Sequence, residues 1–338
     1  MSETITQQAL RALVDEWIGA GTKVAGPSYV KKDLCQYVPL TSSAELLLEG
    51  FIHPRNSVKD FFFPRHEKIY EYTLKGHEVE LADMTPASTP QVIVAARPCD
   101  TAAVAILDAV FNWGEKDEFY TQRREAATIV ALACVTHDSH CFCTSVGIGP
   151  DAEKGADVML LPLDGGFEVR CLTEKGKTLF AGRTQPSDKT AVIPEGPKVK
   201  VSPEQVRAAL EDYDNPLWKT ATLRCLSCGA CSFTCPTCHC FDIVDEGNAH
   251  GGCRAKNWDS CQLCMFTKHA SGHNPRNVQG QRQRQRTQHK FRIYPDKFGE
   301  VLCTGCGNCA RNCPVSLGIL GTLVELCAEM PKTVGESK

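Results

Sequence analysis

The stretch RCLSCGACSFTCPTCHCFD, residues 224–242, contains six cysteines within a single short segment. The first four follow the pattern C-x2-C-x2-C-x3-C-P, and Cys238 and Cys240 come directly after it. The whole chain has 20 cysteines among 338 residues, which indicates either a disulfide scaffold or a metal protein. Residues 1–21 are acidic and amphipathic and lack the basic and apolar parts of a signal peptide. We therefore expect a cytoplasmic metal protein.

This cysteine pattern is typical of ligands to a [4Fe–4S] cluster, and it recurs in CTGCGNCARNCP, residues 303–314. In ferredoxins with two clusters, the last cysteine of each motif binds the cluster of the other motif. The predicted ligands are Cys225, Cys228, Cys231 and Cys313 for the first cluster, and Cys303, Cys306, Cys309 and Cys235 for the second. Zinc knuckles are a weaker alternative, because zinc usually takes separated C-x2-C pairs.

A third cluster is predicted in the N-terminal half. AARPCD (95–100) and ACVTHDSHCFC (133–143) each begin where a predicted strand ends. The carboxyl ends of parallel strands share one sheet edge, so four cysteines would meet there: Cys99, Cys134, Cys141 and Cys143. Asp100 or His140 is a conceivable substitute ligand. A zinc site and plain buried thiols are the alternatives.

The surplus cysteines Cys238 and Cys240 are followed by more cysteines in GGCRAKNWDSCQLC (251–264). A further metal site would use Cys238, Cys240, Cys261 and Cys264. The competing interpretation is that these thiols pack around the clusters and tune their reduction potentials.

The order of predicted elements divides the chain into two domains. Helical periodicity over 5–19, 65–75, 101–112 and 117–126 alternates with strand-like runs at 78–82, 91–96, 128–135 and 157–163. Residues 1–182 should therefore form an α/β domain with a partly parallel sheet, and a linker should follow at 183–204. After residue 205 strand signals nearly vanish, so 205–338 should be a mostly helical two-cluster ferredoxin domain with an insertion at 236–302.

Residues 276–292 are rich in arginine and lysine, although the chain as a whole has a net charge of −3. Basic runs often bind nucleic acid, but this one has no aromatic stacking platform and no accompanying nucleic-acid fold signature. Thiolate-bound clusters are anionic, so the favoured interpretation places these cations against the clusters or a partner protein. No uninterrupted apolar run is long enough to span a membrane.

Several segments, taken in order, resemble the 4Fe–4S subunit family that includes the beta subunits of cytoplasmic NAD(P)-linked [NiFe] hydrogenases (sulfhydrogenases) and the corresponding 4Fe–4S subunit of anaerobic sulfite reductase. The segments are KDFFFPRHE, RPCD, YTQRRE, CFCTSVG, CGACSFTCPTCHCFD, NWDSC, GHNPR, RQRTQHKF and CTGCGNCARNCP, between about residues 55 and 325. The resemblance implies the same eight cluster ligands in the two motifs. Cys253 and Cys264 lie outside the family pattern.

The resemblance implies a protein that passes electrons between a metal-containing catalytic subunit, of hydrogenase or sulfite-reductase type, and a flavin-containing, NAD(P)H-oxidising subunit. The chain contains neither G-x-G-x-x-G after a strand nor G-x4-G-K-[ST], so we expect no nucleotide site and no catalytic site of its own. The alternative function is an iron–sulfur sensor or nucleic-acid-binding protein that uses residues 276–292.

Overall fold

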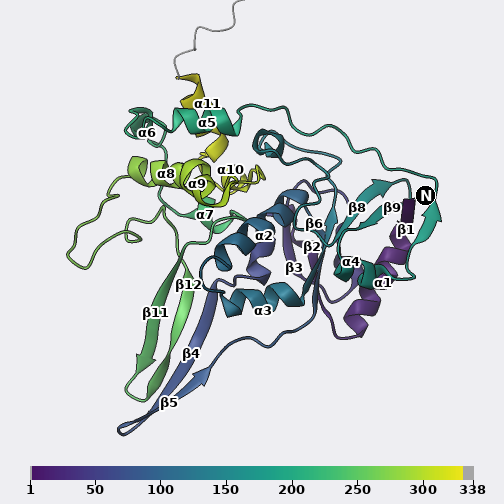
Figure 1. The fold of residues 1–338 in the computed structure, drawn as a ribbon, viewed down its shortest axis with the longest axis horizontal. Coiled ribbons are helices and arrows are strands. Elements are labelled where there is room, and N and C mark those ends of the chain that lie inside the picture. The colour runs from purple at the N-terminus through teal and green to yellow at the C-terminus, as the bar shows by residue number, and fades with distance from the viewer. Residues whose placement is uncertain (1, 330–338) are drawn as a thin grey trace, which may run out of the picture.

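The structure, a computed structural model, describes residues 2–329. Met1 and residues 330–338, the end of the predicted C-terminal domain, lie outside the described part. The described chain forms an eight-stranded sheet, a four-stranded sheet and a group of short helices joined by cysteine-rich turns (Figure 1). An α/β half followed by a more helical half agrees with the prediction, whereas the four-stranded sheet was not predicted.

The eight-stranded sheet is mixed, with a parallel centre. Its order is β10-β1-β9-β8-β7-β6-β2-β3, and the pairs β8–β7, β7–β6 and β6–β2 are parallel. Its strands are β1 (Ser2–Thr6), β2 (Lys23–Lys31), β3 (Leu34–Pro39), β6 (Gln91–Ala96), β7 (Ala127–Leu132), β8 (Val158–Leu163), β9 (Gly166–Cys171) and β10 (Gln185–Ser187). The runs predicted at 91–96, 128–135 and 157–163 are β6, β7 and β8, which confirms a partly parallel sheet.

Helices cover both faces of this sheet. They are α1 (Gln7–Gly19), α2 (Pro98–Phe111), α3 (Glu118–Ala126) and α4 (Glu174–Phe180). In α1, apolar side chains recur at helical spacing and pack with Phe180 of α4 on one face. On the other face, Val104 and Leu107 of α2 and Tyr120 of α3 pack against Ile93. The Thr6 hydroxyl accepts a hydrogen bond from an N–H in the first turn of α1 and so caps that helix.

The four-stranded sheet, which we call the arm, extends away from the rest of the molecule (Figure 1). Its order is β11-β12-β4-β5, and all of its pairs are antiparallel. Its strands are β4 (His66–Lys75), β5 (Glu78–Asp83), β11 (Phe241–Asn248) and β12 (Gly251–Trp258). The arm therefore joins two hairpins that are far apart in sequence.

The arm overturns two sequence-based expectations. The predicted helix at 65–75 is strand β4, because Ile69, Tyr70 and Tyr72 suit a pleated surface and β12 supplies the backbone partners. Strand signals also do not vanish after residue 205, since β11 and β12 lie inside the predicted insertion. Because β12 pairs with β4, strand pairing crosses the predicted division between the domains.

Short helices surround the cysteine-rich turns in the second half. They are α5 (Pro203–Ala209), α6 (Leu217–Thr220), α7 (Ala230–Phe233), α8 (Gln279–Gln288), α9 (Tyr294–Phe298), α10 (Asn308–Arg311) and α11 (Ile319–Ala328). One π-helical turn, His289–Ile293, joins α8 to α9. The apolar core of this half also contains Phe142 and Val146 from the first half and Val201 from the predicted linker. The two halves therefore share a core as well as a sheet.

No helix within residues 2–329 combines the length and the apolar character needed to cross a membrane.

Candidate iron–sulfur centres

The two ferredoxin-like motifs have the same local structure. Each is a loop that ends in a one-turn helix, α7 in the first motif and α10 in the second, and the two helices pack against each other. Gly229 and Gly307 precede these helices with φ of 75° and 78°, a left-handed conformation that favours glycine. A Cβ at Gly307 would lie 2.5 Å from the carbonyl oxygen of His140, so no larger residue fits there.

The cysteines predicted to hold the second cluster, which we call the second site, are all buried. They are Cys235, Cys303, Cys306 and Cys309. Burial raises the pKa of Cys303 to about 11, and the nearby Cys235 and Cys309 act in the same direction. Burial and then Cys235 also raise the pKa of Cys306 well above its ordinary value. The structure thus brings Cys235 of the first motif among the cysteines of the second motif.

The cysteines of the first site lie closer to the surface. They are Cys225, Cys228, Cys231 and Cys313, of which Cys228 is exposed and the others are half-buried. Burial raises the pKa of Cys231 to about 11 against the opposing effect of Arg286, and Cys309 and Cys225 are among the neighbouring groups. Cys313 follows α10, and its sulfur accepts a hydrogen bond from the N–H of Leu317 at 3.3 Å. Cys231 therefore borders the second site through Cys309.

Three cations of the basic stretch contact residues of the first cysteine motif, Arg282 through the Ser227 hydroxyl. Arg282, Arg286 and Lys290 lie four residues apart along α8 and the π-helical turn, so they share one face, and all three are buried. The Lys290 Nζ lies 3.3 Å from the Cys235 sulfur, and an Arg286 Nη lies 3.2 Å from the Cys231 carbonyl oxygen. Burial lowers the pKa of Arg286, but the surrounding thiolates outweigh this effect and raise it.

The buried guanidinium of Arg286 has unused hydrogen-bond donors. Its Nε and Nη1 atoms have no partner among the protein atoms of the described chain. An orphaned buried donor costs free energy unless an acceptor or an anion faces it. A sulfide-rich anionic cluster held by the neighbouring cysteines would supply that negative charge, so these residues fit the group that the sequence predicts.

The four cysteines of the third site also come together. Cys99 opens α2 just after β6, Cys134 follows β7, and Cys141 and Cys143 lie in the loop beyond. All four line one cavity at the carboxyl edge of the parallel strands, and Cys306 of the second site lines the same cavity. Burial raises the pKa of Cys99 well above its ordinary value, with contributions from Asp100 and then Cys306.

The loop that carries the third site is fastened to the second motif. The Phe142 N–H donates to the Gly305 carbonyl at 2.9 Å, and a Cβ at Gly305 would lie 2.5 Å from the backbone of Cys143. Arg311 of α10 donates to the Cys141 sulfur at 3.0 Å and to both carboxylate oxygens of Asp138. Arg311 holds the pKa of Asp138 below its usual range, although burial works in the opposite direction.

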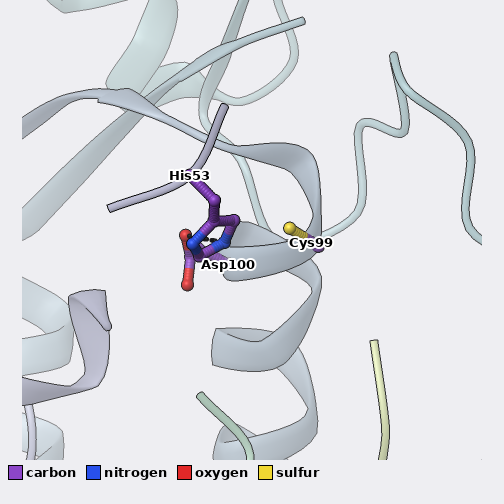
Figure 2. A group of neighbouring side chains, drawn as sticks. All are labelled: His53, Cys99 and Asp100. Carbon is purple, nitrogen blue, oxygen red and sulfur yellow. Dashed lines mark ion pairs between the residues drawn. The ribbon is translucent and has the colours of Figure 1, made fainter. Parts of the chain in front are cut away.

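The proposed substitute ligands Asp100 and His140 have other contacts. Asp100 is buried, and its Oδ2 lies 2.9 Å from the Tyr37 hydroxyl and 3.0 Å from His53 Nε2, beside Cys99 (Figure 2). His140 lines a different cavity, with Gly307.

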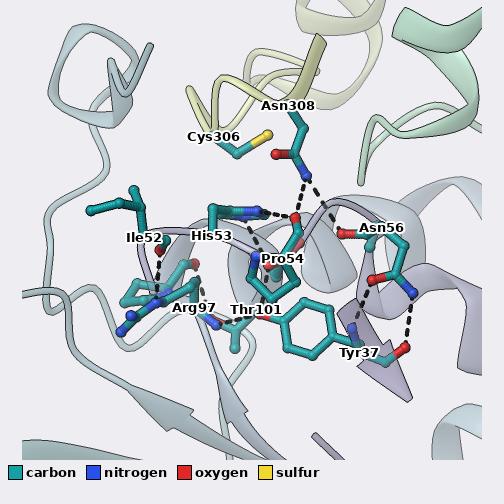
Figure 3. A network of polar contacts seen from close by, with 12 residues as sticks. Tyr37, Ile52, His53, Pro54, Asn56, Arg97, Thr101, Cys306 and Asn308 are labelled. Atoms are coloured by element: carbon teal, nitrogen blue, oxygen red, sulfur yellow. Dashed lines mark hydrogen bonds and ion pairs between the residues drawn. The ribbon is translucent and has the colours of Figure 1, made fainter. Parts of the chain in front are cut away.

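Segment 51–56 connects the second and third sites, and no sequence motif pointed to it. Figure 3 shows His53 and Pro54 below Cys306, with the Asn308 amide donating to the Pro54 carbonyl at 2.9 Å. The Arg97 guanidinium holds the other end by donating to the carbonyls of Phe51 and Ile52 at 2.6 and 3.1 Å. These are backbone contacts between distant parts of the chain, which side-chain patterns do not reveal.

The surplus cysteines surround a separate cavity of about 340 Å³. Cys238, Cys240 and Cys261 line it together with His239 and His289, whereas Cys264 is exposed and does not. Burial lowers the pKa of each histidine to about 4, so both rings are neutral near pH 7. The neighbouring Cys240 lowers the pKa of the Cys261 thiol to about 6, and Cys261 raises the pKa of the Cys240 thiol.

The thiol spacing in these sites is wider than a single tetrahedral zinc ion requires. Zinc–sulfur bonds of about 2.3 Å place the sulfurs within roughly 4 Å of one another. Within residues 2–329, one group of side chains has three potential ligand atoms within 4.8 Å of one another. It consists of His53, Cys99 and Asp100, so it contains a single thiol. Within the described residues, no three sulfurs of the cysteine sets above lie that close together, so no set is drawn in as tightly as one zinc ion requires.

The paired cysteine motifs, the approach of Cys235 to the second motif and the buried cations are those of an iron–sulfur electron-transfer protein. Residues 224–317 match the family model of the 4Fe-4S dicluster domain. Over 249 residues the chain is 30% identical to sulfhydrogenase 2 subunit beta of Pyrococcus furiosus, an alignment that covers 70% of this chain and 73% of that protein. The chain therefore belongs to the family of 4Fe–4S electron-transfer subunits that includes this beta subunit. No solved structure matches it.

Proposed function

We propose that this chain relays electrons between the catalytic subunit of a hydrogenase-type complex and a flavin-containing, NAD(P)H-oxidising subunit. The relative is by name the beta subunit of a sulfhydrogenase, which supports a place in such an assembly. A [4Fe–4S] centre with four thiolate ligands supplies a reversible one-electron change and leaves no iron position open for a substrate. The proposed role is therefore electron transfer and not catalysis within this chain.

This proposal rests on one observation, namely that the three cysteine sites lie next to one another. Cys231 of the first site lies near Cys309 of the second, and Cys306 of the second site lines the same cavity as Cys99 of the third. The second site is buried, whereas Cys228 at one end is exposed and Cys141 at the other is half-buried. Such a row, buried in the middle and accessible at its ends, suits a relay between two partners.

Residues of this chain would adjust the reduction potentials of the clusters in this row and keep water away from them. Lys290 and Arg286 keep positive charge beside the thiolates, which favours the more negative, reduced state of a cluster. The burial of Cys303, Cys306 and Cys309 excludes water from the second site. The inward direction of these cations also supports the relay over nucleic-acid binding through residues 276–292.

Replacement of Cys306 by alanine in the assembled complex tests the relay. We expect Cys306→Ala to abolish electron transfer from NAD(P)H to the catalytic subunit, because the middle site would lose a ligand. Dye reduction by the flavin subunit within the same variant complex should not change. Cys35→Ala is the matched control, since Cys35 is a buried cysteine of β3 that lines none of the three sites. Unchanged overall turnover in Cys306→Ala would refute the relay.

A further inference from the structure

Four large apolar side chains are exposed in the two segments that surround the first cysteine site. They are Leu223, Leu226, Met265 and Val278, and each is more than half exposed. Cys228, a predicted ligand of the first cluster, is also exposed and follows Leu226 by two residues. We call these five residues the port surface. Single exposed apolar residues are ordinary, whereas a group of them marks a site where another protein binds.

Hydrogen bonds and close packing hold the two segments together. The Arg282 guanidinium of α8 donates to the Ser227 hydroxyl in the first motif at 2.9 Å, and it also donates to the Asn277 carbonyl at 2.9 Å. A Cβ at Gly280 would lie 2.8 Å from the Trp218 carbonyl oxygen, so the start of α8 packs closely on α6. Helices α6 and α8 accordingly lie next to each other (Figure 1).

The loop that carries Met265 is also fixed against the first motif. A Cβ at Gly229 would lie 3.1 Å from the Ser260 hydroxyl at the start of this loop. Farther along, the Asn274 amide donates to the Cys264 carbonyl at 2.5 Å and closes the loop beside Met265. The port surface therefore has a fixed shape, and a partner that binds it would order few side chains on this chain.

The charges around the port surface are mostly positive. Residues 215–241 and 260–295 contain no aspartate or glutamate, although the whole chain has 40 acidic residues. The exposed lysines and arginines of these two segments are Lys219, Arg224 and Lys268. Two acidic groups approach from elsewhere in the chain: Asp214 pairs with Arg284 at 2.5 Å, and Glu325 lines a cavity with one of the exposed cations. The excess of cations favours a partner with an acidic surface.

We propose that the port surface is the docking site for the acidic surface of another redox protein, which exchanges electrons with the first cluster there. The apolar side chains would contact the middle of the partner's surface, and the exposed cations would face carboxylates at its rim. One electron leaves the reduced centre and enters the oxidised one, and no covalent bond forms or breaks. This inference rests on the proposed relay and assigns one of its two ends to a defined surface.

Carbodiimide cross-linking of the intact complex tests the docking site. The reagent joins a lysine to a carboxylate that it contacts, and mass spectrometry identifies the joined peptides. We expect Lys219 and Lys268 to be joined to aspartates or glutamates of another subunit of the complex. The proposal would be overturned if neither lysine is joined to another subunit in a sample where other lysines of this chain are.

Charge reversal at the port surface gives a second test. In the complex with Lys219→Glu and Arg224→Glu, we expect electron transfer from NAD(P)H to the catalytic subunit to fall by about tenfold or more, because like charges would face each other. The iron content and the electron paramagnetic resonance of the reduced clusters should not change. Lys31→Glu with Lys32→Glu is the matched control, since both lysines are exposed at the end of β2, and it should leave the rate unchanged.

The outcomes separate this inference from the relay. A normal rate in the port-surface variant, together with a blocked rate in Cys306→Ala, would reject the docking site alone. A normal rate in Cys306→Ala would reject the relay, and the docking site with it.

Discussion

Lys290 combines complete burial with contact to a predicted cluster ligand. Its ammonium lies 3.3 Å from the Cys235 sulfur, 2.9 Å from the Thr237 hydroxyl and 2.8 Å from the Leu302 carbonyl. Burial would lower the pKa of Lys290, yet the thiolates of Cys235 and Cys238 outweigh it and raise the pKa. The lysine therefore stays charged beside the second site.

We expect Lys290→Gln to lower the midpoint potential of one cluster, because a positive charge that stabilises the reduced state is removed. A fall of about 60 mV or more would correspond to at least a tenfold change for a one-electron couple. A redox titration followed by electron paramagnetic resonance measures it. Lys268→Gln, an exposed lysine in the same insertion, should leave all midpoints unchanged. Equal midpoints in Lys290→Gln and wild type would show that this charge does not act on a cluster.

At the scale of elements, a network of charged side chains attaches the arm to helix α3, which covers the main sheet. The Lys256 Nζ of β12 lies 3.0 Å from a Glu67 carboxylate oxygen of β4 and 3.1 Å from an Asp117 oxygen at the start of α3. Arg123 of α3 also pairs with Glu67. Lys256 and Glu67 are almost fully buried, so each charge depends on its partners.

Replacement of Lys256 by alanine should destabilise the protein by about 2 kcal/mol, because the buried Glu67 carboxylate keeps Arg123 but loses its lysine partner. Arg254→Ala removes an ion pair from the same strand, but Arg254 and Asp245 are exposed, so its cost should stay below about 1 kcal/mol. Anaerobic urea denaturation followed by tryptophan fluorescence compares the two variants. Similar losses of stability in both would contradict the role assigned to the buried pair.

Features that depend on neighbouring residues could be predicted from the sequence, whereas contacts between residues far apart in the chain could not. The strands at 91–96 and 128–135 and the cysteine motifs are local patterns, so they could be predicted. The strand at 66–75 could not, because its partner lies about 180 residues away and its own periodicity is compatible with a helix. His53 and Asn308 were missed for the same reason, since tertiary folding brings the Asp100 carboxylate near His53 and the Pro54 carbonyl near Asn308.

At the scale of the whole molecule, the iron content distinguishes a protein with two clusters from one with three. We expect about twelve iron and twelve sulfide ions per chain if all three sites hold [4Fe–4S] clusters, and about eight if the third does not. Cys134→Ser should lower the iron content by about four and leave the signals of the other two clusters in place. Iron and acid-labile sulfide analysis measures this. Eight irons in wild type, unchanged in the variant, would exclude the third cluster.

The pairing of β4 with β12 also bears on how the chain is made. The end of strand β4 leaves the ribosome about 175 residues before the start of β12. At about 5–20 residues per second, its unpaired edge would wait for roughly 10–35 s. Charged side chains such as Lys68, Glu71 and Lys75 along β4 discourage pairing with other chains during that time. The arm therefore forms late in synthesis, and a nascent chain arrested before residue 251 would present an open strand edge to cellular chaperones.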